Sequence, residues 1–258
     1  MIRLEFPPAQ QGTRIARIPG RLLTELRLWQ PGGEAAYVTD DVESAAVLLH
    51  GTFDLFGNGT AWPARGARTT ELLGRPMAVF LPPKADFRAH GPVGEIAVVA
   101  ARRPDPEPEA AGREALSRKP LLPLAGSGKA FDPGSGEWKP AETFPTAAES
   151  LPPRRMTQHK VGDVVVERVF APDYKAAVLS VDEAVLPPGA SLALAAIPGR
   201  PPALEAMVLV RSEGLARIGD RPAEGGEYAW LLDAGEIEAT TITAVEGRCY
   251  VLVAYAGK

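Results

Sequence analysis

Histidine is the side chain that most often holds a transition metal, and this sequence contains only three of them. A zinc, iron or manganese site of the usual kind needs two or three imidazoles that converge on one ion. His50, His90 and His159 each stand alone in the sequence, with no motif that joins them. We interpret them as turn or surface histidines and expect no metal and no cofactor, while a metal shared between distant segments stays open.

Other reactive groups are equally isolated. Cys249, the single cysteine, lies in the apolar run CYVLVAYA with no histidine nearby, so we expect a small buried hydrophobe rather than a nucleophile. One thiol cannot form an internal disulfide, which is typical of a reducing, cytoplasmic compartment. The glycine-rich stretches GSGKAF (126–131) and DPGSGEW (132–138) lack the strand, helix and Lys-Ser/Thr pair of a phosphate-binding loop.

Charge and hydropathy exclude several classes of partner. The net charge is −4, and no block of lysine or arginine favours nucleic acid or an anionic membrane surface. No stretch reaches the length of a membrane span, and the N-terminus lacks the apolar core of a signal peptide. Apolar residues make up 45% of the chain, enough for a substantial core. We therefore expect a globular protein without nucleic-acid or membrane partners.

Proline divides the chain. Ten of the 26 prolines fall between Pro104 and Pro153. Because proline removes backbone donors, we expect no strand ladder to run through this segment, and at most one short helix near 110–117. The predicted organisation is an N-terminal arm at 1–103, a proline-rich linker at 104–153 and a C-terminal arm at 154–258.

Both arms have the hydrophobic pattern of short strands, and neither contains a long amphipathic helix. Turn signals recur every 8–12 residues, which indicates an all-β sandwich or barrel. The predicted strands of the first arm are 22–29, two runs within 44–57 that break at Gly51, 77–81 and 95–101. Those of the second arm are 162–170, 175–186, 206–219, 228–232, 240–245 and 249–256.

The two arms also repeat each other weakly. FLPPKADF (80–87) parallels LLDAGEIE (231–238), HGTFDLFG (50–57) parallels EGLARIGD (213–220), and EIAVVAA (95–101) parallels the closing run CYVLVAY. One such unit has strands, a Pro-Gly turn and a closing apolar strand in the order of a small jelly roll. The repeat therefore predicts two similar barrels in tandem.

The repeat resembles the cupin signature. The first cupin motif places His-x-His and a glutamate between two glycines, and in the first arm its spacing fits from Gly32 to Gly51. The second motif, Pro-x-Gly-x-x-His, falls on PPKADF and on DAGEIE. The resemblance implies two cupin-like barrels, with metal ligands replaced throughout. The positions that the frame assigns to ligands are Val38, Asp40, Ser44 and Phe87 in the first arm, and Ala195, Ile197, Glu205 and Glu238 in the second.

The whole chain further resembles the two-barrel sugar-acid isomerases that include 5-deoxyglucuronate isomerase and 5-keto-4-deoxyuronate isomerase. AVLLHGTFDLFG and GRPMAVFLPPKADFRAHG follow that family's order in the first arm, as VDEAVLPPGAS and YVLVAYAG do in the second. The family holds a divalent metal in the second barrel through histidines after the Pro-Pro turn. Here the corresponding stretch, PPGASLALAAIPGRPPALEAM, has no histidine. We expect a metal-free, degenerate two-barrel cupin that binds a small carbohydrate-type metabolite such as a sugar acid, and that forms a homo-oligomer.

Two other functions stay open. If the alignment is right, Glu205 and Glu238 both point into the second barrel, where paired carboxylates could act as acid and base in an aldose–ketose isomerisation. Whether the chain is an enzyme therefore depends on these two glutamates, which could also be solvated at the barrel mouth. The third function is a structural or interaction protein whose barrels are filled by side chains.

Aromatic residues bear on that choice. Phe87 at a ligand position predicts an apolar plug in the first barrel. Trp29, Trp62, Trp138 and Trp230 could stack on sugar rings, but they also suit core or rim packing.

Overall fold

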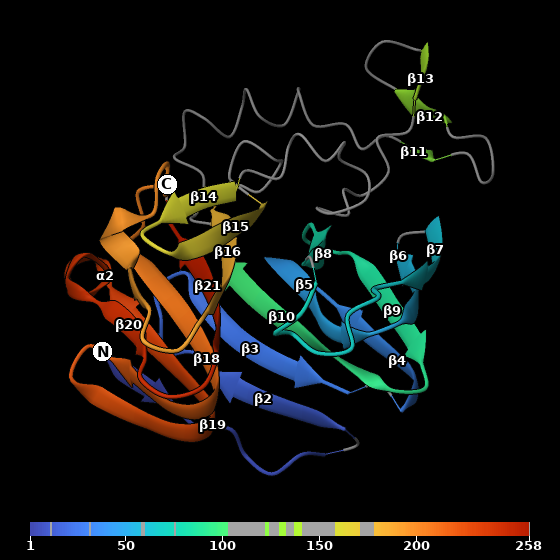
Figure 1. Cartoon of the computed structure of the whole chain (residues 1–258). Coiled ribbons are helices and arrows are strands. Elements are labelled where there is room, and N and C mark those ends of the chain that lie inside the picture. The colour runs from blue at the N-terminus through green and yellow to red at the C-terminus, as the bar shows by residue number, and fades with distance from the viewer. Residues whose placement is uncertain are drawn as a thin grey trace, which may run out of the picture.

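The computed structural model describes the two arms and short parts of the segment between them (Figure 1). Strands make up nearly all of its regular structure. None of the helices described is long and apolar enough to cross a membrane. The described residues are 1–10, 12–30, 32–57, 60–74, 76–102, 122–123, 129–132, 137–140, 158–170 and 178–257.

The first barrel consists of two antiparallel sheets, one of five strands and one of four. Their facing side chains form a closed core that includes Trp29, Phe53 and Phe87. The five-stranded sheet runs in the order β2 (Thr13–Arg17), β3 (Leu23–Trp29), β10 (Gly94–Arg102), β5 (Val42–Gly51) and β8 (Met77–Leu81). The four-stranded sheet runs in the order β4 (Gly33–Val38), β9 (Asp86–Gly91), β6 (Phe53–Gly57) and β7 (Thr60–Arg65).

The second barrel is one nine-stranded sheet. Its core includes Trp230, Ile237 and Tyr255. The main path is β1 (Ile2–Leu4), β19 (Arg221–Asp233), β18 (Glu205–Ile218), β21 (Cys249–Ala256), β16 (Leu179–Leu186), β15 (Val164–Phe170) and β14 (Gln158–Val161). Beside it, β17 (Ser191–Ala193) pairs with β20 (Thr241–Ala244), and two short helices, η2 (Leu194–Ala196) and α2 (Ala234–Ala239), complete this barrel.

A third core cluster lies between the barrels and contains residues of both arms. Side chains alternate along β18, so that Val208 and Val210 fill the second barrel while Met207 and Leu209 enter the contact with the first. β10 alternates likewise between the first barrel and the contact. Strands buried on both faces have continuous apolar runs. This explains why EIAVVAA and CYVLVAYA carry almost no polar residue.

The strand predictions are confirmed in type and approximate position. The runs 77–81 and 249–256 coincide with β8 and β21, and the break at Gly51 separates β5 from β6. In the two arms, the predictions missed short strands whose sequences lack a clear apolar alternation: β1, β2, β4, β7, β9, β14 and β17.

Two features of the chain differ from the predicted organisation. β1 belongs to the N-terminal arm in sequence, yet Arg3 pairs with Trp230 of β19 in the second barrel. The expectation that no ladder runs through the linker is wrong, because β11 (Leu122–Pro123), β12 (Lys129–Asp132) and β13 (Glu137–Pro140) form a small antiparallel sheet. Lys129–Asp132 contains no proline, so its donors remain free to pair. The predicted helix at 110–117 lies outside the described residues.

The first barrel supplies a test of its packing. Phe87 is fully buried and meets Trp29 edge to face at a ring distance of 6.1 Å. We expect Phe87→Ala to lower the free energy of unfolding by about 3–5 kcal/mol, because it leaves a cavity in a closed core. The matched control is Phe56→Ala on the same sheet, where 44% of Phe56 is exposed and the loss should stay below about 1 kcal/mol. Equal losses in urea unfolding would contradict this packing.

Candidate functional site

The ligand positions of the cupin frame do not form a polar site in the first barrel. Val38 is 56% exposed, and Asp40 lies in an exposed turn. Ser44 is buried, and its hydroxyl lies 3.1 Å from that of Tyr37. Phe87 occupies the interior, so the predicted apolar plug is confirmed.

In the second barrel the frame positions diverge. Ala195 is exposed on η2, and Ile197 is buried in the barrel core. Glu238 lies on α2 with a side chain that is 59% exposed, and it forms an ion pair with Arg200. Glu205 is buried. The expectation that Glu205 points into the second barrel is wrong, because its position on β18 shares the face of Met207 and Leu209, which enter the contact between the barrels.

The Glu205 carboxylate accepts three backbone N–H groups of the first arm. Arg21 donates to Oε2 at 2.7 Å, Leu22 donates to Oε1 at 2.6 Å, and Leu23 also donates to Oε1. These are the residues that lead into β3. The structure therefore gives Glu205 a clear positioning role, in which it holds the start of a first-arm strand against the second barrel. Its predicted role as an acid or base is a separate matter and stays a prediction, as does that of Glu238.

The opposite contact is made by Glu43, which the sequence did not single out. Its Oε1 accepts the N–H groups of Val178 at 2.8 Å and Leu179 at 2.7 Å, at the start of β16. In the strand register, Glu43 pairs with Ala101, which pairs with Leu23. Glu205 pairs with Ala256, which pairs with Leu179. Each barrel thus presents a glutamate from equivalent strands to the backbone of the other, and we call these two contacts the reciprocal clamps.

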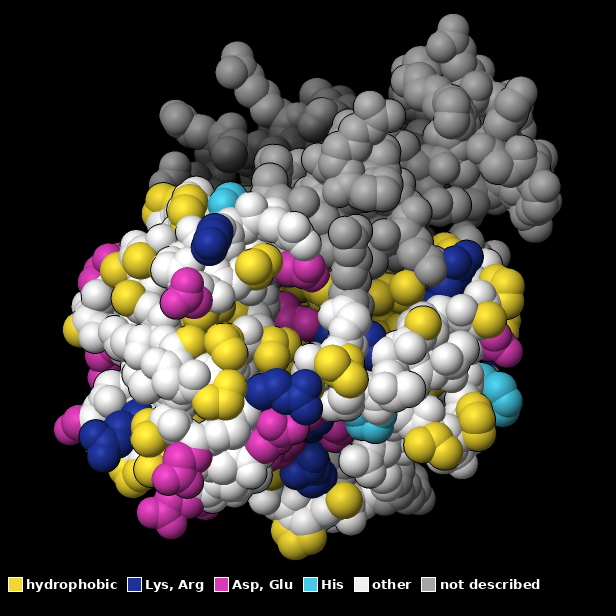
Figure 2. Space-filling view, viewed as in Figure 1, with side chains coloured by type: hydrophobic (Ala, Val, Ile, Leu, Met, Phe, Trp, Pro, Cys, Tyr) yellow, Lys and Arg dark blue, Asp and Glu magenta, His cyan; other side chains and the backbone are white. Residues whose placement is uncertain are grey.

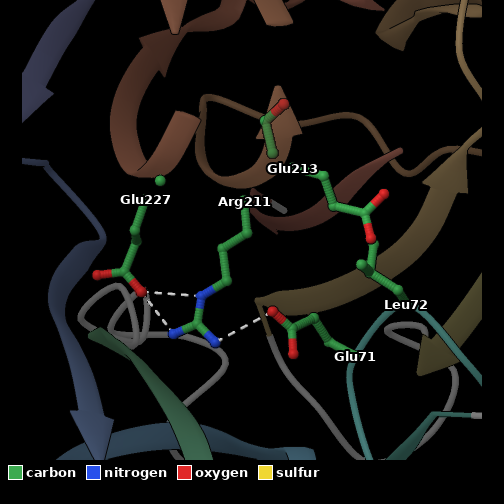
Figure 3. A pocket seen from close by; sticks show the side chains of 7 residues that line it. Glu71, Leu72, Arg211, Glu213 and Glu227 are labelled. Atoms are coloured by element: carbon green, nitrogen blue, oxygen red, sulfur yellow. Dashed lines mark hydrogen bonds and ion pairs between the residues drawn. The ribbon is translucent and has the colours of Figure 1, made fainter. Parts of the chain in front are cut away.

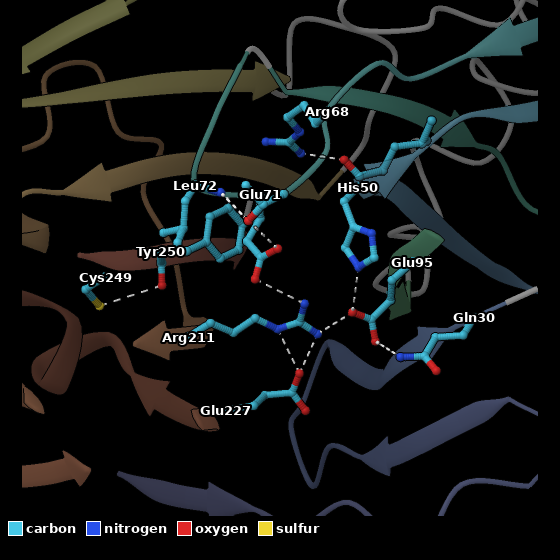
Figure 4. Close-up of polar contacts among 12 residues, drawn as sticks. Gln30, His50, Arg68, Glu71, Leu72, Glu95, Arg211, Glu227, Cys249 and Tyr250 are labelled. Atoms are coloured by element: carbon cyan, nitrogen blue, oxygen red, sulfur yellow. Dashed lines mark hydrogen bonds and ion pairs between the residues drawn. The ribbon is translucent and has the colours of Figure 1, made fainter. Parts of the chain in front are cut away.

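A charged network surrounds Arg211 at the same contact (Figure 4). Its guanidinium lies 2.6 Å from the Glu95 carboxylate, 2.5 Å from that of Glu227 and 3.4 Å from that of Glu71. Arg14 donates to Glu227 at 2.7 Å. Burial lowers the pKa of Arg211, but the surrounding carboxylates outweigh it and raise that pKa. Arg211 therefore stays charged and joins strands of both barrels.

A second buried ion pair lies beside it. Arg68, in the segment between β7 and β8, forms an ion pair with Glu183 of β16. Tyr250 donates its hydroxyl to Glu183 at 3.1 Å. Burial raises the pKa of Glu183 to about 6 against the opposing effect of Arg68. Both networks belong to the contact between the barrels and not to a barrel interior.

The space beside Arg211 is an open depression of about 290 Å³ (Figure 3). Its lining includes Glu71, Glu213 and Glu227, and Arg211 is already paired with two of them. Figure 2 shows acidic and basic side chains side by side between the barrels on this face. Because the depression carries more carboxylates than free cations, it does not suit a sugar acid.

The three histidines lie apart. His50 on β5 lies 4.0 Å from the Glu95 carboxylate at the contact. His90 is exposed on β9, and His159 lies on β14 at the edge of the second sheet. Among the described residues, no group of three or more His, Cys, Asp or Glu side chains could hold a metal ion. Cys249 is buried, and burial raises its pKa to about 12, as suits a small hydrophobe.

Three of the four tryptophans have core positions. Trp29 and Trp62 belong to the core of the first barrel, and Trp230 to that of the second. Trp138 lies on β13, and its side chain is outside the described part.

Known proteins resemble this chain in structure but not in sequence. No protein-family model matches it, and no curated protein matches it significantly. An IolB-like protein of Salmonella typhimurium LT2 superposes with a TM-score of 0.64 at 15% identity, over 99% of this chain and 92% of that one. A putative glyoxylate-induced protein of Pseudomonas aeruginosa gives 0.55 at 13% identity, over 98% and 83%.

A mutant of Bacillus subtilis oxalate decarboxylase gives a TM-score of 0.53 at 9% identity, over 99% of this chain and 77% of that one. At such identities the likeness concerns the fold alone. The chain is an all-β protein with two cupin-type barrels in tandem. Within that fold, it is similar to the IolB-like protein over nearly its full length.

The reciprocal clamps can be tested by two substitutions and a control. Glu205→Gln replaces one accepting oxygen by an NH2 group that opposes a backbone N–H, so we expect a loss of about 2 kcal/mol in the free energy of unfolding. Glu43→Gln should cost less, about 1 kcal/mol, because both N–H groups bond Oε1 and the amide oxygen can still accept them, without the negative charge. Glu238→Gln, on an exposed side chain, should change stability by less than about 0.5 kcal/mol. The clamps would be refuted if all three variants unfolded at the same urea concentration as the parent.

Proposed function

We propose that this protein is a metal-free two-barrel cupin that acts by binding a small carbohydrate-type metabolite rather than by catalysis. The observation that carries the proposal is that, in each barrel, a buried apolar side chain stands at a position where the cupin frame places a ligand. Phe87 in the first barrel and Ile197 in the second are the clearest cases. Neither side chain can coordinate an ion or transfer a proton.

The positions of the imidazoles support the same proposal. His50 faces a carboxylate at the contact between the barrels, and His90 is exposed on the outer face of its strand. A cupin-type metal needs imidazoles inside one barrel. Of the three histidines, only His159 lies near the interior of the second barrel, so neither barrel has the two or three imidazoles that such a site needs.

A second function, that of a structural or interaction protein, is favoured by the first barrel. Its core is closed by large side chains such as Trp29, Phe53 and Leu55, each almost completely buried. In our proposal this barrel is a scaffold that supports the second through the shared contact.

The third function is an active isomerase of a deoxy-keto sugar acid with Glu205 and Glu238 as acid and base. Glu205 already accepts three backbone N–H groups, and Glu238 is largely exposed beside Arg200. Both Glu205 oxygens are therefore already occupied by backbone donors at the contact between the barrels. Turnover of 5-deoxyglucuronate that falls at least a hundredfold in Glu238→Gln would favour this function over ours. A homo-oligomer and a cytoplasmic location stay predictions.

The metal content of the protein distinguishes most directly between a metal-free binding protein and a metal-dependent isomerase. We expect elemental analysis of the purified protein by mass spectrometry to find transition metal far below one ion per chain. Bacillus subtilis oxalate decarboxylase, a protein with Mn(II) centres, is the matched control. One ion per chain, retained after dialysis against a chelator and accompanied by isomerase activity, would overturn the proposal.

A further inference from the structure

The second barrel is not apolar throughout, because one part of its interior is charged. Asp182 follows the same alternation along β16 as Ala184 and Leu186, which lie in the barrel core. Arg168, its cross-strand partner on β15, donates to both Asp182 oxygens, at 2.9 Å from Nε and at 3.2 Å from a terminal nitrogen. The pair is almost completely buried.

Arg168 also ties this pair to the loop after η2. Its other terminal nitrogen donates to the carbonyl of Gly199 at 2.5 Å. The next residue, Arg200, places its guanidinium carbon 5.9 Å from the centre of the Tyr255 ring and pairs with Glu238. Strands β15, β16 and β21 and the loop after η2 therefore bring charged and aromatic groups together in this barrel.

Several polar atoms of this group lack hydrogen-bond partners among the described residues. They are buried, and they come from three separate parts of the chain: Tyr255 Oη, Arg200 Nε and His159 Nε2. Tyr255 is fully buried. Native proteins rarely leave such groups unsatisfied, and each exception calls for a bound molecule or water.

Electrostatics place these atoms in one neighbourhood. Burial raises the pKa of Asp182, and three nearby groups lower it: Arg168 first, then His159 and Arg200. Burial and the charge of Asp182 raise the pKa of the Tyr255 hydroxyl, so it stays protonated and can donate. His159, Arg200 and Tyr255 therefore all lie close enough to Asp182 to interact with its charge.

We propose that this group, formed by Arg168, Asp182, Arg200, Tyr255 and His159, binds a neutral, polyhydroxylated small molecule. Both arginines are already paired with carboxylates, so the group has no surplus charge for an anion. What remains unpaired is a mixture of donors and acceptors: an N–H group, a phenolic hydroxyl and an imidazole nitrogen. Hydroxyl groups match such a mixture, because each can donate and accept. The inference rests on the proposed binding function and replaces the expected sugar acid by an uncharged polyol or sugar.

Isothermal titration calorimetry of the full-length protein tests the inference, with glycerol, erythritol, xylitol and D-glucose as probes at millimolar concentration and D-gluconate as the charged comparison. We expect saturable binding of at least one neutral probe, and weaker binding of gluconate than of glucose. Tyr255→Phe removes one unpaired hydroxyl and should weaken binding about tenfold.

Tyr250→Phe is the matched control, because that hydroxyl lies on the same strand but donates to Glu183 outside the barrel. It should leave affinity unchanged. If Tyr255→Phe folds poorly, Arg200→Ala serves as a second test, because it removes the unpaired Nε donor. The inference is overturned if no neutral probe binds the parent chain, if gluconate binds more tightly than glucose, or if Tyr255→Phe or Arg200→Ala binds as well as the parent. Those results leave the metal analysis above unaffected, so failure of the site and failure of the metal-free function are distinguishable.

Discussion

The contact between the two barrels is the constraint on which the rest of the structure depends. Its apolar cluster draws on β3, β5 and β10 from one arm and on β16, β18 and β21 from the other. All of these strands except β3, which adds only Trp29, also fill their own barrel with alternate side chains. A polar substitution on either face would therefore expose or strain a core, and the barrels cannot separate without exposing apolar surface to water.

Polar groups within that contact fix how the barrels meet. Apolar packing alone tolerates sliding, whereas a carboxylate that accepts two or three backbone N–H groups fits one position. Glu43 and Glu205 provide this in both directions, and the Arg211 network adds ion pairs between strands of the two arms. Buried charges are costly to separate from their partners, so this arrangement favours specificity of docking more than net stability.

The sequence predicted the strands that are buried on both faces, because a run such as Cys249–Ala256 admits few alternatives. It also predicted the plug at Phe87, since the resemblance to the second cupin motif assigned that residue to a ligand position. It did not predict the pairing of Ile2–Leu4 with the second barrel, which depends on long-range packing. Glu43 and Glu205 were missed as clamps because their partners are backbone groups, which carry no sequence signal. The polar group at Asp182 was also missed. Asp182 lies in a mostly apolar strand, and only the strand register makes Arg168 its partner.

The two barrels share one apolar contact, and apolar side chains fill most of the interior of each. The most direct test of the central claim, that both barrels form one unit, is differential scanning calorimetry of the intact chain. We expect a single transition whose calorimetric and van't Hoff enthalpies agree. Two resolved transitions, or a calorimetric enthalpy near twice the van't Hoff value, would show that the barrels melt separately and would contradict it.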